Sequence, residues 1–143
     1  MRIFSLFIIL SSVFLMGCSD DDSSDPTSDD QIVGRWELTH QQSGNLITND
    51  TPCHQQSYIQ WNGDFTADRK AYTTDGQGQC LLTAEAVGTW EVISESDDES
   101  SSSPNYRFIT DEGSTIEETI IFLDNNTLYI DYSFIDFYYT RVE

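Results

Sequence analysis

The chain has 143 residues, with six basic and 25 acidic side chains, and a formal net charge of −19 at pH 7. Such acidity argues against a nucleic-acid-binding protein, because contacts with phosphates need lysine and arginine. It also favours solubility and repels anionic surfaces. The length allows one domain with one hydrophobic core, once the N-terminal segments are set aside.

Residues 1–17 have the pattern of a secretory signal peptide. Arg2 is followed by twelve mostly apolar residues, Ile3 to Phe14. This run is too short for a membrane span, which takes about 20 apolar residues. A basic start followed by a short apolar stretch is typical of an export signal. The alternative, a buried helix, fits poorly with the abrupt change to polar residues that follows.

A cysteine stands at the end of this segment. Leu15-Met16-Gly17-Cys18 resembles the lipobox of bacterial lipoproteins, although Met16 replaces the small residue usual at that place. The resemblance implies cleavage before Cys18 and acyl chains such as palmitate on that residue. Two or more such chains anchor a protein stably in a membrane. The alternative is a free or disulfide-bonded Cys18. Loss of Arg2 with the signal would leave a mature charge of −20.

The next segment, residues 18–30, is predicted to be an acidic, disordered tether. Ser19-Asp20-Asp21-Asp22 resembles a surface-export signal of one large group of Gram-negative bacteria. The serine also avoids the aspartate that usually retains lipoproteins in the inner membrane. The resemblance implies an outer-membrane lipoprotein on the cell surface. The alternative is a plain solvated linker, since acidic, serine-rich segments bury too little apolar surface to fold.

Residues 31–143 are predicted to form one all-β domain. Short runs of aromatic and β-branched residues alternate with turns rich in Gly, Asn, Asp and Ser, which is typical of a sandwich or barrel. The turns include 62–64, 111–114 and 124–126, and 94–104 reads as a mobile loop. Eight strands are predicted, at about 31–40, 56–62, 65–74, 82–93, 105–110, 114–123, 126–133 and 136–142.

Two of these strands echo each other. Gly34-Arg35-Trp36 and Gly88-Thr89-Trp90 each place a glycine two residues before a tryptophan. Alternation of side chains along a strand puts Trp36 on the same face as Ile32 and Leu38. Each glycine would let a neighbouring backbone or ring come close. Trp36, Trp90 and Trp61 are therefore predicted to lie in the interior.

The domain resembles the small lipocalin-like lipoproteins of Gram-negative bacteria. The likeness rests on the two Gly-x-Trp strands, a cysteine pair, the 62–65 hairpin and the aromatic last strand that ends at 139–142. The long 94–104 loop and the short apolar hairpin at 133–136 depart from it. The resemblance implies an eight-stranded up-and-down antiparallel barrel. Such a barrel is filled by side chains or holds one small ligand.

Cys53 and Cys80 are predicted to form a disulfide. Three cysteines is an odd number for an exported chain, and a lipid on Cys18 would leave these two as a pair. Export would place them in an oxidising compartment, where a disulfide persists. In an up-and-down barrel both would lie in loops at one end, leaning together over the strand between them.

No catalytic or metal-binding set is evident. His40 and His54 are 14 residues apart and match no zinc pattern. Glu117 and Glu118 alternate between the faces of a strand, so they would not converge as an acid–base pair. We therefore expect no enzyme, no cofactor and no metal, and a monomer. Two functions stay open: a binder of a small apolar ligand, or a filled barrel that serves as a surface interaction or structural module.

The two open functions differ in one observable. A cavity of about 300 Å³ or more, with an open mouth, would favour binding. A packed interior would favour the module.

The alternating direction of the strands predicts which end of the barrel carries the ligand mouth or partner contact. The 41–55, 75–81, 111–114 and 133–136 connections fall at the end away from residue 31. Phe134 and Ile135 would be apolar residues at a hairpin tip, where polar residues and glycine are usual. With Tyr132 and Phe137 behind them, they are predicted to form a rim, either the ligand mouth or a partner contact. The alternative is a tip that folds inward as a plug.

Overall fold

The computed structural model describes residues 30–49, 52–94 and 104–142. The predicted signal peptide, Cys18, nearly all of the tether and most of the 94–104 loop lie outside the described residues. Within them, no helix is long and apolar enough to cross a membrane.

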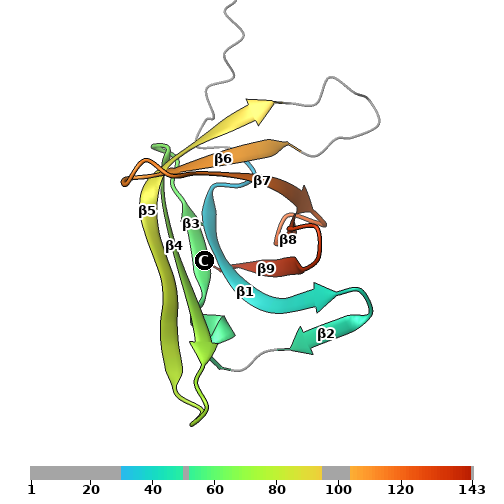
Figure 1. Ribbon diagram of the computed structural model, residues 1–143. Coiled ribbons are helices and arrows are strands. Elements are labelled where there is room, and N and C mark those ends of the chain that lie inside the picture. The colour runs from blue at the N-terminus through green and yellow to red at the C-terminus, as the bar shows by residue number, and fades with distance from the viewer. Residues whose placement is uncertain (1–29, 50–51, 95–103, 143) are drawn as a thin grey trace, which may run out of the picture.

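The described residues form nine strands and one turn of 3-10 helix, η1 (Figure 1). Seven of the eight predicted strands match an observed one closely, and the first extends further along the chain than predicted. The strands are β1 (Gly34–Ser43), β2 (Leu46–Asn49), β3 (Tyr58–Trp61), β4 (Thr66–Thr74), β5 (Cys80–Ser94), β6 (Asn105–Thr110), β7 (Thr115–Phe122), β8 (Thr127–Asp131) and β9 (Asp136–Val142), and η1 is His54–Gln56.

The sheet closes on itself through β1. Residues 34–37 of β1 pair with β3 on one side, and residues 35–42 pair with β9 on the other. Every neighbouring pair from β3 to β9 is antiparallel and consecutive along the chain. The result is the eight-stranded up-and-down antiparallel barrel that the family resemblance implied. Closure removes the free edges of an open sheet.

The ninth strand, β2, was not predicted. β1 continues to Ser43, turns at Gly44-Asn45, and returns as β2, which pairs with β1 alone. Gly44 has φ +57°, a value that favours glycine. A two-residue Gly-Asn turn between two extended runs is a known hairpin signal. The polar residues Gln41 and Gln42 hid it, because they break the apolar pattern of a strand.

The core fills the half of the barrel where the chain enters. Trp61 meets Trp90 edge-on, with ring centroids 5.7 Å apart, and also contacts Tyr106 and Phe108. Trp36 is fully buried, and its indole N–H donates to the carbonyl of Ile32 at 2.8 Å. We call this part of the interior the filled half.

The glycine of each Gly-x-Trp strand permits a close approach. A Cβ on Gly88 would lie 2.0 Å from the carbonyl oxygen of Ile109 on β6, so no side chain fits there. A Cβ on Gly34 would lie 2.7 Å from the guanidinium of Arg141. The backbone of β6 thus comes close at Gly88, as the sequence predicted, whereas the neighbour at Gly34 is the side chain of Arg141.

Arg141 closes the filled half. Its guanidinium lies over the ring of Trp36, 4.2 Å from the centroid. It donates hydrogen bonds to the backbone carbonyls of Val33, Gln31 and Asn125. A single side chain of β9 therefore links residues 31–33, where the chain enters the barrel, to the β7–β8 turn.

An aromatic row lies on the outer face, across the seam where β1 meets β9. The ring of His40 stacks on Tyr138 at 4.3 Å, and Tyr138 stacks on Tyr129 of β8 at 5.2 Å. Directly opposed aromatic pairs of this kind stabilise strand pairing. The row therefore supports the closure of the barrel.

Candidate functional site

The interior beyond the filled half is hollow. It contains a cavity of about 630 Å³, bounded by β1, β3, β4, β5, β7 and β9. The hollow arises from side-chain size, because Ala71 of β4 faces Ala84 of β5 in register, and Ala86 follows on the same face. The apolar lining comprises Leu38, Ile59, Ala71, Ala84, Ala86, Ile116, Phe137 and Tyr139.

A charged pair lies at the inner end of the cavity, where the guanidinium of Arg69 lies over the ring of the buried Phe108, 4.6 Å from its centroid. Arg69 of β4 lines the cavity and donates two hydrogen bonds, of 2.8 and 2.9 Å, to the carboxylate of Glu118 on β7. Glu118 has no exposed side-chain surface, and Arg69 is 17% exposed. The hydroxyl of Tyr132 also donates to Glu118. We call Arg69, Glu118, Tyr132 and the neighbouring Tyr139 the floor.

The environment fixes the protonation of the floor. Burial lowers the pKa of Arg69, but its hydrogen bonds to Glu118 and the charge of that carboxylate raise it further, so the net shift is upward. The pKa of Tyr132 is raised by burial, by the charge of Glu118 and by the hydrogen bond to it. Burial and the charge of Glu118 also raise the pKa of Tyr139. At neutral pH the guanidinium of Arg69 is therefore charged, and the phenols of Tyr132 and Tyr139 are un-ionised.

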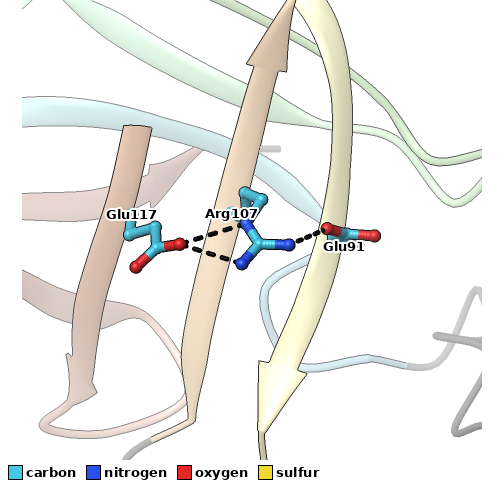
Figure 2. Close-up of polar contacts among 3 residues, drawn as sticks. All are labelled: Glu91, Arg107 and Glu117. Atoms are coloured by element: carbon cyan, nitrogen blue, oxygen red, sulfur yellow. Dashed lines mark hydrogen bonds and ion pairs between the residues drawn. The ribbon is translucent and has the colours of Figure 1, made fainter. Parts of the chain in front are cut away.

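The neighbouring carboxylate, Glu117, points the other way. Figure 2 shows it on the outer face of the sheet, where Arg107 of β6 bridges it to Glu91 of β5. The closest contacts are 2.7 Å from Arg107 to Glu91 and 2.9 Å to Glu117. Glu117 and Glu118 thus diverge, as strand alternation predicted.

The predicted disulfide lies beside the cavity. Cys53 and Cys80 are bonded, with Cα atoms 5.1 Å apart. The expectation that both lie in loops was wrong for Cys80, which is the first residue of β5 and pairs with Thr74. The bond joins the segment before η1 to the β4–β5 hairpin. Ser57 reinforces this link by accepting a hydrogen bond from the backbone N–H of Tyr72 at 2.8 Å.

The 133–136 hairpin lies at the end of the barrel away from residue 31. The hydroxyl of Ser43, at the end of β1, donates to the carbonyl of Phe134 at 3.0 Å. The amide of Gln31 instead donates to the carbonyl of Asp124, in the β7–β8 turn, at 3.4 Å. The chain thus enters at the filled half, and the hairpin stands at the hollow half.

The four rim residues separate into two pairs. Tyr132 and Phe137 line the cavity and meet edge-on, with centroids 5.4 Å apart, although Tyr132 is also 40% exposed. Phe134 and Ile135 do not line it and are 85% and 38% exposed. Phe134 therefore points to solvent and does not plug the mouth. Of the predicted interior residues, Trp36, Trp61 and Trp90 are all buried.

The sequence of residues 32–130 matches the model of a family described as a lipocalin-like domain. The chain belongs to this lipocalin-like family. A search of the curated proteins finds no match.

Two solved structures share the barrel. A lipocalin-like protein from Bacteroides uniformis ATCC 8492 is 9% identical, with a TM-score of 0.51 and a match over 78% of this chain and 99% of that one. An uncharacterized protein from Bacteroides eggerthii DSM 20697 is 7% identical, with a TM-score of 0.50 and coverage of 77% and 98%. At such identities the likeness shows the fold alone.

Sequence reasoning missed the floor of this lipocalin-like barrel. The inward position of Glu118 follows from alternation, but nothing in the sequence names Arg69 as its partner on another strand. It also missed Leu46 and Ile47 on β2, which are 69% and 52% exposed at the hollow end. In the described ranges, no group of His, Cys, Asp and Glu could hold a metal ion.

Proposed function

We propose that this protein is a lipid-anchored, lipocalin-like binding protein that holds one small apolar ligand in the hollow half of its barrel. The observation that carries the proposal is the cavity of about 630 Å³ with its mainly apolar walls. Ligand sites of proteins usually measure about 300–1,000 Å³ and combine apolar walls with a few polar groups. The floor supplies those polar groups.

A second candidate function, a surface interaction module, is favoured by a different observation. Phe134 is 85% exposed on a hairpin tip, and Leu46 and Ile47 are exposed at the same end. Exposed apolar residues that gather at one place often mark a contact with another molecule. The two functions are compatible, because the contact would lie beside the mouth.

The membrane anchor is part of the proposal. Acyl chains on Cys18 would hold the protein in the outer membrane, on the cell surface, through the acidic tether. The chain enters the barrel at the filled half, where the hydroxyl of Tyr106 donates to the Asp30 carboxylate at 3.2 Å. The mouth would then point away from the membrane.

Two variants test ligand binding. The protein is extracted from its own cells, and its mass is measured under native conditions. We expect a bound small molecule on the wild type and its loss in Ala86→Phe, which fills the cavity. Val87→Phe is the matched control, because Val87 is 51% exposed on the opposite face of β5. A wild type without any added mass would contradict the proposal.

The anchor has a separate test. Cys18→Ser should move the protein from the membrane fraction to the soluble fraction, and an acyl mass should be found on wild-type Cys18. A variant that stays with the membranes, together with a wild type without acyl mass, would exclude the anchor.

A further inference from the structure

The cavity presents no uncompensated charge to a ligand. The charge of Arg69 is matched by Glu118 through two hydrogen bonds. The other charged lining residues, Lys70 and Glu85, are joined by an ion pair of 2.7 Å. The formal charges of these four residues therefore sum to zero, despite the strongly acidic composition of the chain.

A charged head group would be unfavourable at the floor. A carboxylate that approached Arg69 would also approach Glu118, which is fully buried and cannot swing into solvent. A cation would approach the guanidinium of Arg69. Either ion would lose its hydration without gaining an unpaired partner, and burying a charge in this way is unfavourable.

Hydrogen-bond donors are in surplus at the floor. Within the described chain, the Nε–H of Arg69 has no hydrogen-bond partner. Tyr139 lines the cavity, and its hydroxyl donates to no other described residue. Burial, and then the charge of Glu118, raise the pKa of Tyr139, so this phenol keeps its proton. The acceptor capacity of Glu118 is largely taken by Arg69 and Tyr132.

We propose that the cavity selects neutral, lipid-like molecules whose inner end carries a hydrogen-bond acceptor, such as the oxygen of a ketone or an ester. The inference rests on the proposed binding function and names the chemical class of the ligand. The hydrocarbon part lies against the apolar walls, and the acceptor oxygen receives hydrogen bonds from Tyr139 and Arg69. Fatty carboxylates and alkylammonium ions are rejected.

Three probes of similar chain length test this selection. The chain from residue 18 onward, with Cys18→Ser, is titrated with 2-undecanone, decanoate and decylammonium. Binding is read from displacement of the neutral dye N-phenyl-1-naphthylamine. The titration is carried out at pH 8. We expect the ketone to bind at least about tenfold more tightly than either ion, a difference of about 1.4 kcal/mol.

The outcomes separate the two proposals. If decanoate or decylammonium binds as tightly as the ketone, the inference is overturned and the binding function stands. If neither the dye nor any probe binds, the binding function fails, and the inference fails with it.

A charge change at the floor provides a second test. Glu118→Gln keeps an oxygen for Tyr132 but leaves Arg69 without its counter-charge, so the affinity for decanoate should rise at least about tenfold relative to the ketone. Glu117→Gln makes the same change on the outer face of the same strand and should leave the ratio unaltered. A folded Glu118→Gln protein with the wild-type preference would overturn the charge argument. If that variant does not fold, the relative affinities of the wild type for the three probes decide whether the inference holds.

Discussion

Arg69 and Glu118 are joined across the barrel interior by two hydrogen bonds of 2.8 and 2.9 Å, although 49 residues separate them in sequence. Such a buried ion pair adds little net stability, because the loss of hydration offsets the attraction. Removal of one partner, however, leaves a buried charge without compensation. The pair therefore makes each of its members necessary and keeps the inner end of the cavity neutral.

The first prediction concerns the stability of this pair. Glu118→Leu should lower the free energy of unfolding by about 3–5 kcal/mol, because it leaves Arg69 uncompensated in the interior. The double variant Arg69→Met with Glu118→Leu should regain most of that loss. Urea unfolding of both variants and the wild type measures the effect. Arg107→Met, on the exposed outer face, is the control and should change stability little.

Stability at alkaline pH should depend on three tyrosines, of which Tyr106 and Tyr139 are buried and Tyr132 is 40% exposed. Burial first, and then nearby carboxylates, raise the pKa values of Tyr106, Tyr132 and Tyr139. Above the ordinary tyrosine pKa of about 10, the unfolded chain releases phenolic protons that the folded chain keeps, so unfolding becomes more favourable. The stability is present below pH 10 and falls as the pH rises past it.

Denaturant unfolding at pH 8, 9, 10 and 11 checks this pH dependence. Tyr139→Phe should weaken the fall above pH 10, because it removes one of the three phenols. A free energy of unfolding that stays constant to pH 11 would contradict the assignment.

Gly88 should tolerate no side chain. A Cβ there would lie 2.0 Å from the carbonyl oxygen of Ile109, so Gly88→Ala must push β5 and β6 apart. We expect a loss of at least about 2 kcal/mol in the free energy of unfolding, as is found when a packed interior is overfilled. Gly76→Ala is the matched control, since a Cβ at that position would meet nothing within 4 Å. Equal stability of the two variants would refute the prediction.

Alternation and turn residues predicted much of the fold, for clear physical reasons. Trp36 and Trp90 face inward because side chains alternate along a strand, and Gly88 is needed because β6 passes close to it. Contacts between side chains on strands that are not neighbours could not be predicted from the sequence. The contact of Arg69 with Glu118 depends on how far the strands are staggered when the sheet closes. The β-bulge between Ala71 and Tyr72 shifts that stagger locally.

The cavity was equally hidden in the sequence. Its volume depends on which alanines face each other, and only the register sets Ala71 opposite Ala84. The β1–β2 hairpin had a signal in Gly44-Asn45, but its polar strand residues masked it. The disulfide was predictable without the register, because the prediction of a lipid on Cys18 left Cys53 and Cys80 as a pair.

Removal of the disulfide should loosen the mouth as well as the fold. The bond closes a loop with a sequence separation of 27 residues. Cys53→Ala with Cys80→Ala should therefore lower the free energy of unfolding by about 3–4 kcal/mol in the chain-entropy model. Hydrogen exchange should rise around η1, which the bond ties to the β4–β5 hairpin. A peptide map without reductant that shows two free thiols in the wild type would disprove the bond.

The last prediction separates the two proposed functions at the rim. Phe134→Ser with Ile135→Ser should leave the fold intact, because Phe134 is 85% exposed and neither residue lines the cavity. The native mass should still show the ligand, whereas recovery of any cell-surface partner in a pull-down should fall. Leu81→Ser with Leu82→Ser is the control, because these residues are also exposed but lie on a different hairpin. If partner recovery is unchanged in the first variant while its circular dichroism matches the wild type, Phe134 and Ile135 are not a contact surface. Loss of the ligand in that variant would instead mean that Phe134 or Ile135 contacts the ligand, which their absence from the cavity lining argues against.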